Sequence, residues 1–566
     1  MTATQDQIQA MLEPYRIIYT KVEVLDFDYN YISEIQGVIT SMSFSNDASS
    51  DIRRTGNISI IPDKDSLEFI TGNPSWLTKY IRLSVGVKFK SNESDENGVL
   101  WYKQGTYLPN SPSTSYSQDD NTLTLDLTDM MSKFTGMRNG QLSGIEYQIP
   151  AGSNIAEKMS DVMLVAGIPL SKQIINDPQL VVPEDIIISA GSMVSDIITQ
   201  LRDIPSDWEA FFDIDGFFRF QEVPKTQNAP FLTGADDTLW TDCMLKVSLD
   251  NDFEAVKNYI EVWGKTHEIA SGNYGNTAVV SGSEYQITLS SVTSLYDGMQ
   301  VGFTIPAIVS NPMLKINALE SIPLVDDNGN NAVIDDVNFY AVVQYNQTDN
   351  NFLYLGHLQA RAISKNTNPD SPFFIGEEMH IEDGGVSVAG NVITLSTTST
   401  STVMAQLKDT VIGFYIPSGY SPYNPNATLI LNGVNMGEKD ILNEDGTEIG
   451  VVGGYCLISY NGTNFVYKGN KNGIGIIRNT LLDGDYDVIY SDSLCKNRAD
   501  WELYKKSNLN ETLSMETVPV YFLDTNVKIS YTKPDDTTPT FWLIKSYSFD
   551  ADESATETIS MTRLYE

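Results

Sequence analysis

Short runs that alternate apolar and polar residues recur along most of the chain, and they predict β-strands with one buried face. Residues 54–62 and 121–127 (NTLTLDL) show this period of two. Turn residues separate the runs at spacings typical of a β-sandwich or barrel. Residues 1–135 are therefore predicted to form a first antiparallel β domain.

The pattern changes over residues 136–224, where helical periods appear. Apolar residues spaced three and four apart predict two helices with one buried face each. The clearer set is Val194, Ile197, Ile198 and Leu201. Two aromatic runs follow, and residues 213–216 (DIDG) between them predict a tight hairpin. This stretch is predicted to be an α+β segment.

Alternating runs return in residues 225–277 and 470–566, which are predicted to form a second, discontinuous β domain. Residues 259–263 and 518–522 are two of its predicted strands. Residues 498–506 are predicted to form a short helix.

Two copies of one module interrupt this second domain, at residues 278–357 and 386–469. Residues 301–306 (VGFTIP) match 412–417 (IGFYIP), and further matching strands and turns follow in the same order. Each module is predicted to be a small β-barrel or sandwich. Residues 358–385, rich in Asn, Pro and Ser near their start, are predicted to link them. The predicted fold class is thus mainly β with a small α+β segment, in several domains.

Charge narrows the possible partners. Lys and Arg total 36 against 74 Asp and Glu, a formal net charge of −38. This balance argues against specific nucleic-acid binding and against binding to anionic membranes. We expect no membrane insertion, because no apolar run is long enough to cross a bilayer, and no signal peptide, because residues 1–12 are polar. The three cysteines are widely spaced and are expected to be free thiols.

Candidate chemistry is sparse. The three histidines lack partners at metal-ligand spacing, and no nucleophile or phosphate-binding motif is present. We therefore expect no enzymatic activity, no cofactor and no metal site. Residues 327–330 and 444–447 are predicted to be equivalent hairpin turns of the two modules. Candidate glycan contacts are Tyr420, Tyr423 and Phe465, whose rings could stack on a sugar.

The order of several stretches resembles the baseplate hub, or tail-associated, proteins of tailed bacteriophages. The modules likewise resemble repeats of phage tail-fibre and baseplate proteins. The second module has the pattern at residues 460–465 (YNGTNF), from which the first module departs. The stretches that carry the hub resemblance are residues 105–107, 121–131, 211–220, 257–264 and 558–565.

This resemblance implies a homotrimer in which two similar β domains per chain form a ring. Such a ring adapts the sixfold tail tube to the threefold tail tip and surrounds the DNA ejection channel. The implied partners are the tail tube or distal tail protein, the spike, tip or tape measure protein, and other baseplate proteins. The implied location is the virion tail. The alternatives are a protein that binds host-surface glycans through its two modules and a wall-degrading enzyme.

Overall fold

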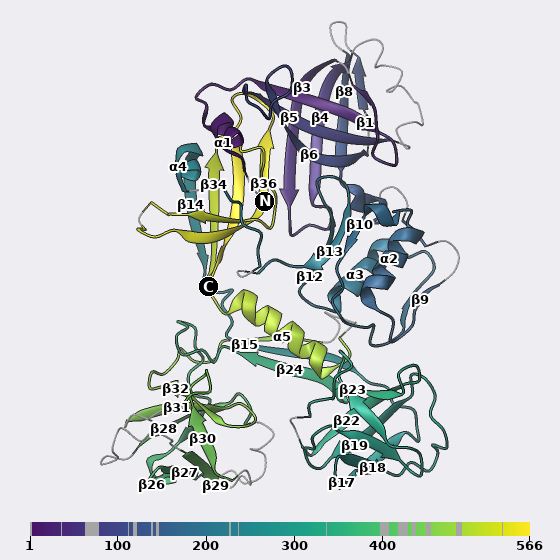
Figure 1. Cartoon of the computed structure of the whole chain (residues 1–566), viewed down its shortest axis with the longest axis vertical. Coiled ribbons are helices and arrows are strands. Elements are labelled where there is room, and N and C mark those ends of the chain that lie inside the picture. The colour runs from purple at the N-terminus through teal and green to yellow at the C-terminus, as the bar shows by residue number, and fades with distance from the viewer. Residues whose placement is uncertain are drawn as a thin grey trace.

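The computed structural model has a mainly β, multidomain architecture drawn out along one axis (Figure 1). The large sheet lies at one end, the two modules lie at the other, and helix α5 lies between them. The structure describes residues 3–35, 37–62, 79–110, 113–116, 121–136, 140–142, 146–225, 228–235, 237–334, 337–396, 407–416, 428–432, 437–448, 454–482, 489–534 and 536–565.

A single 13-stranded sheet contains strands of both predicted β domains. Its main path runs β14-β34-β37-β36-β3-β4-β8-β6-β5-β1-β2, with β35 paired to β36 and β7 paired to β8. The two halves meet where β3 and β36 pair in antiparallel register from Ser43 and Asp550 to Asp47 and Ser546.

The first half contains α1 (Gln5–Leu12), β1 (Ile18–Leu25), β2 (Tyr31–Glu34), β3 (Gly37–Asp47), β4 (Arg54–Pro62), β5 (Tyr80–Lys88), β6 (Val99–Pro109), β7 (Ser113–Tyr116) and β8 (Asn121–Thr128). The second half contains α4 (Asp237–Cys243), β14 (Met244–Asp252), β34 (Asn510–Thr517), β35 (Lys528–Tyr531), β36 (Thr540–Asp550) and β37 (Glu557–Leu564).

One hydrophobic core serves both halves, because alternate residues of the strands point to the same side. Ile58 of β4, Leu125 of β8 and Met561 of β37 belong to it and are fully buried. The predicted strand at 518–522 is wrong. These residues form a connection, and the strand is β34, which begins eight residues earlier and contains the alternating stretch LSMET.

The predicted α+β segment is confirmed at its main elements. Its helices bury the predicted apolar face, including Val194, Ile197 and Leu201. The hairpin turn is also present, with Gly216 at a positive φ of 83° that suits glycine. The elements are β9 (Tyr147–Ile149), α2 (Ile155–Val165), β10 (Gln173–Ile175), β11 (Ile186–Ile188), α3 (Val194–Asp203), β12 (Trp208–Phe212) and β13 (Phe218–Glu222).

A separate three-stranded sheet changes the predicted organisation. Residues 259–263 do not join the large sheet. They lie in β15, which pairs with β24 and β33. Strand β24 falls within residues 358–385, which were predicted to be a linker. The Asn- and Pro-rich part of these residues begins only after β24 ends. The elements are β15 (Tyr259–Thr266), β24 (Gln359–Lys365), β33 (Arg478–Leu481) and α5 (Asp492–Lys506).

Helix α5 packs on this sheet and begins six residues before the predicted start. The Ser491 side chain caps it by accepting a hydrogen bond from the Leu494 amide at 3.1 Å.

The predicted repeat is confirmed, because the two modules have the same strand order. Each forms an eight-stranded, nearly closed sheet around its own core. The first contains β16 (Tyr274–Thr277), β17 (Val279–Ser281), β18 (Glu284–Ile287), β19 (Gln300–Ile305), β20 (Met313–Ile316), β21 (Ile322–Val325), β22 (Phe339–Asn346) and β23 (Asn351–His357). The second contains β25 (Met379–Ile381), β26 (Val386–Ala389), β27 (Val392–Ser396), β28 (Val411–Tyr415), β29 (Thr428–Asn432), β30 (Lys439–Leu442), β31 (Tyr455–Tyr460) and β32 (Phe465–Gly469).

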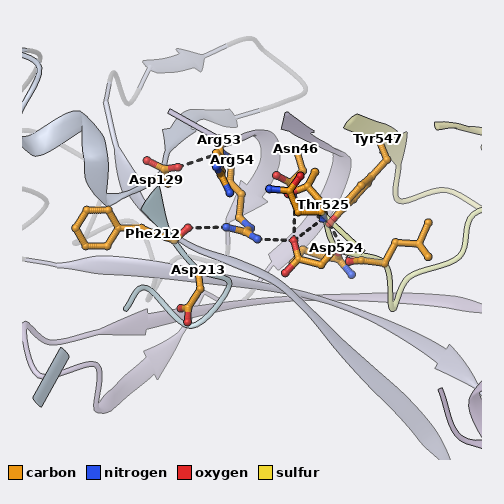
Figure 2. Close-up of polar contacts among 12 residues, drawn as sticks. Asn46, Arg53, Arg54, Asp129, Phe212, Asp213, Asp524, Thr525 and Tyr547 are labelled. Atoms are coloured by element: carbon orange, nitrogen blue, oxygen red, sulfur yellow. Dashed lines mark hydrogen bonds and ion pairs between the residues drawn. The ribbon is translucent and has the colours of Figure 1, made fainter. Parts of the chain in front are cut away.

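Arg54 holds the two halves of the sheet and the hairpin together (Figure 2). Its guanidinium donates to the Phe212 carbonyl at 2.6 Å and binds the Asp524 carboxylate at 2.6 Å. Burial alone would lower the pKa of Arg54, but Asp524 and the surrounding polar groups raise it overall. The cation is therefore held charged in the interior, where it joins three segments that are distant in sequence.

Arg53 makes a second, parallel connection. Its guanidinium binds Glu209 of β12 at 2.7 Å and lies 3.8 Å from the centre of the Phe211 ring. Glu209 also accepts from the Asn526 amide group at 2.8 Å. Both arginines thus link the start of β4 to the hairpin and to the second half of the sheet.

We predict that Arg54→Met lowers the free energy of unfolding by about 3–5 kcal/mol, because it leaves the Asp524 carboxylate without its cation. Lys103→Met is the matched control. It removes the ion pair between Lys103 and Asp215 of the same hairpin, whose side chains are 51% and 44% exposed. The control should cost less than about 1 kcal/mol. The first transition in chemical denaturation measures the free energy of unfolding of both variants. Equal decreases in the two variants would contradict the role given to Arg54.

Candidate functional site

The face of the large sheet opposite its core is lined by hydroxyl, amide and carboxylate groups. One row crosses both halves without interruption, each residue paired with the next in register. It consists of Glu516, Thr558, Ser548, Ser45, Thr55 and Thr128, on β34, β37, β36, β3, β4 and β8. The row therefore continues across the junction between β36 and β3, and the two halves form one polar surface.

A second row lies beside the first, and its residues are Asp550, Ser43, Asn57 and Asp126. The two rows border a shallow groove of about 590 Å³ that spans the junction. The Asn57 amide donates to the Asp126 carboxylate at 2.6 Å, so the neighbouring strands are also joined by their side chains.

Neither row contains a Lys or Arg. Lys246 of β14 stands next to the first row, opposite Glu516. Hydroxyls and amides offer only neutral hydrogen bonds, and the carboxylates repel phosphate. The face can therefore lie against a polyanion without binding it.

The sequence indicated this alternation in β8 but not the shared surface. The pairing of β3 with β36 joins residues about 500 positions apart, and no local motif marks it. Ser and Thr at every second position of TSMSFS, TLTLDLT and TISMT was the available signal.

Of the three predicted glycan contacts, only Phe465 lies among the described residues. Tyr420 and Tyr423 lie outside the described residues. Phe465 is fully buried in the core of the second module, where its ring packs 5.3 Å from that of Tyr460. It fills the core, so its face is not available to a sugar.

The two predicted module turns are present and differ in their contacts. In the first, Asp327 is buried and accepts from the Ser491 hydroxyl at 2.9 Å, and burial raises its pKa. In the second, Glu444 binds Lys468 of its own module. The first module is thus fastened to the start of α5 by its turn.

The other reactive groups have structural surroundings. His357 binds Asp492 at 2.6 Å, His380 binds Glu377 at 3.0 Å, and burial lowers the pKa of His267. The three cysteines are buried and free. Over the described parts of the chain, no three His, Cys, Asp or Glu side chains gather as metal ligands. No helix there is both long and apolar enough to span a bilayer.

Two carboxyl groups are buried under the polar face. Burial raises the pKa of Asp129 to about 6, although the amides of Arg54 and Met131 donate to it and oppose the shift. Burial likewise raises the pKa of Glu557 to about 8, against a hydrogen bond from the Val520 amide at 2.9 Å. Both groups favour the folded state most when they are protonated.

We predict that stability falls as pH rises from about 4.5 to about 8. The folded pKa of Glu557 is raised above its ordinary value of 4.5, so its contribution is complete below 4.5 and is lost as pH passes about 8. Glu557→Gln should flatten the dependence of the thermal midpoint on pH, whereas Glu516→Gln on the wet face should leave it unchanged. Parallel profiles for Glu557→Gln and the unaltered chain would contradict this assignment.

A family model described as a domain of unknown function (DUF5048) matches residues 470–566. No curated protein matches the chain significantly. Similar solved structures include a tail protein from Neisseria meningitidis, with TM-score 0.42, 7% identity and 96% of each chain covered.

Two further tail proteins are similar. The prophage MuSo2 tail protein from Shewanella oneidensis has TM-score 0.38 and 8% identity, covering 96% of this chain and 98% of that one. The prophage tail protein gp18 from Listeria monocytogenes has TM-score 0.36 and 8% identity, covering 96% and 94%.

Proposed function

We propose that this chain is a structural hub of a phage tail or a phage-tail-like particle. In this role three copies form a ring whose lumen is the path of DNA, between the sixfold tube and the threefold tip. The observation that carries the proposal is the continuous polar face that crosses both halves of the large sheet. The proposal assigns the chain no reaction.

The open edges of the sheet support closure into a ring. In the described part of the chain, β7 pairs only with β8, and β14 pairs only with β34. Between these edges each copy offers eight strands, in the order β14-β34-β37-β36-β3-β4-β8-β7. Unpaired edges bind other strands readily, so β14 of one copy can pair with β7 of the next.

Side chains at one edge favour burial by a partner. Leu245 and Leu249 of β14 are 56% and 37% exposed. An adjoining copy would cover them and contribute hydrophobic free energy.

The charge of the chain supports a channel for DNA. Phosphate backbones bind proteins mainly through Lys and Arg, and the two rows of the polar face have neither. A net charge of −38 adds general repulsion. DNA can therefore pass without being retained.

The modules lie at the end of the molecule away from the large sheet (Figure 1). We propose that they project from the ring and contact neighbouring baseplate proteins. The hub in turn contacts the tail tube or distal tail protein on one side and the spike, tip or tape measure protein on the other.

We predict that the purified full-length chain has three times its 62.8 kDa mass in solution. Leu245→Asp at the β14 edge should shift the mass to that of one chain, because a charge cannot be buried there without a partner. Leu170→Asp, in the α+β segment and 64% exposed, is the matched control and should leave the trimer intact. Light scattering measures the mass of the unaltered chain and of the two variants.

A mass of one chain for the unaltered protein at all concentrations would weigh against self-assembly. A trimer that persists in Leu245→Asp would show that β14 is not the contact, and the closed ring would then be wrong.

A further inference from the structure

Helix α5 carries two aromatic residues on the side away from its buried residues: Trp501 is half-buried and Tyr504 is 38% exposed. Its buried side contains Leu494, Cys495, Arg498, Ala499 and Glu502. Asn497, Trp501 and Tyr504 follow one another at helical spacings of four and three, so they share the other side. The Trp501 and Tyr504 rings are stacked, with centres 5.6 Å apart and planes 14° apart.

These rings line a pocket of about 420 Å³ to which three parts of the chain contribute. Helix α5 supplies the residues above, and Trp208 of the hairpin supplies a third ring. The turn of the first module supplies Asn328. A volume of this size lies within the usual range for small-molecule sites, about 300–1,000 Å³.

The charged groups of the pocket already have partners, some of them in the pocket and others beside it. The ammonium groups of Lys225 and Lys505 lie 5.5 Å and 5.4 Å from the centre of the Trp501 ring. Lys225 binds Asp207 at 2.6 Å and Glu222 at 2.8 Å. Asp500 accepts from the Ser364 hydroxyl at 2.5 Å and also binds Lys496. Because these charges already have partners, the pocket favours a neutral ligand over an anion or a cation.

Two carboxamides remain for such a ligand. Asn328 and Asn497 are exposed, and neither side chain has a hydrogen-bond partner among the residues that the structure describes. Each carboxamide offers both a donor and an acceptor, which suits a ligand with neighbouring hydroxyls.

We propose that this pocket binds a neutral oligosaccharide. The apolar face of a pyranose ring packs on the aromatic rings of Trp208 and Tyr504, and sugar hydroxyls bind the carboxamides of Asn328 and Asn497. The site is separate from the polar face of the large sheet, and it does not depend on the assembly of three copies into a ring. It would give a structural tail protein a contact with a glycan surface from its body.

Isothermal titration of the full-length chain with tri-N-acetylglucosamine and with maltotriose tests the proposal. At least one of these neutral probes should bind with a saturable signal. Tyr504→Ala and Asn497→Ala should each weaken that binding roughly tenfold, which is about 1.4 kcal/mol. Tyr15→Ala, at a tyrosine 75% exposed and distant in sequence, is the matched control and should leave binding unchanged.

Absence of saturable binding by both probes would overturn the proposal, as would binding that all the variants retain. If Tyr504→Ala fails to fold, Asn497→Ala and Asn328→Ala still decide the outcome, because both positions are exposed. A proline-rich peptide that binds these residues in place of either sugar would also overturn it.

Discussion

The architecture depends on one buried cation. Arg54 is 2% exposed, and it binds Asp524 from the far end of the chain and the Phe212 carbonyl from the hairpin. A buried guanidinium is tolerated only when its partners are in place, so its position fixes theirs. Arg53 makes the same kind of connection through Glu209. These contacts hold β36 beside β3 and make one sheet of two halves.

The polar face follows from that junction. Strand pairing fixes which residues point away from the core, and the register between β3 and β36 carries the rows from Ser548 to Ser45 without a step. A shift of one residue in this register would bring Phe44 and Phe549 to the wet face. The arginine contacts therefore secure the continuous lining that the proposed channel requires. The modules pack around cores of their own and take no part in this junction.

Local patterns predicted much of this fold. Alternation identified strands such as β4 and β8, helical spacing identified α3, and repeated strands identified the two modules. Patterns failed where long-range pairing decides. The strand at residues 259–263 has the same alternation whether it joins the large sheet or pairs with β24, and only tertiary contacts choose. The aromatic Phe465 was similarly ambiguous, because a core ring and a sugar platform look alike in sequence. Neither Arg54 nor Asp524 belongs to a motif, so their pairing could not be foreseen.

The central claim is that three copies close the large sheet around a lumen lined by this polar face. A single-particle electron microscopy reconstruction of the purified full-length chain tests it directly. We predict a threefold ring in which β14 of each copy lies beside β7 of the next, with Ser45, Thr55 and Ser548 facing the central opening. A ring with these residues on its outer surface, or copies joined through the modules with both edges unpaired, would contradict it.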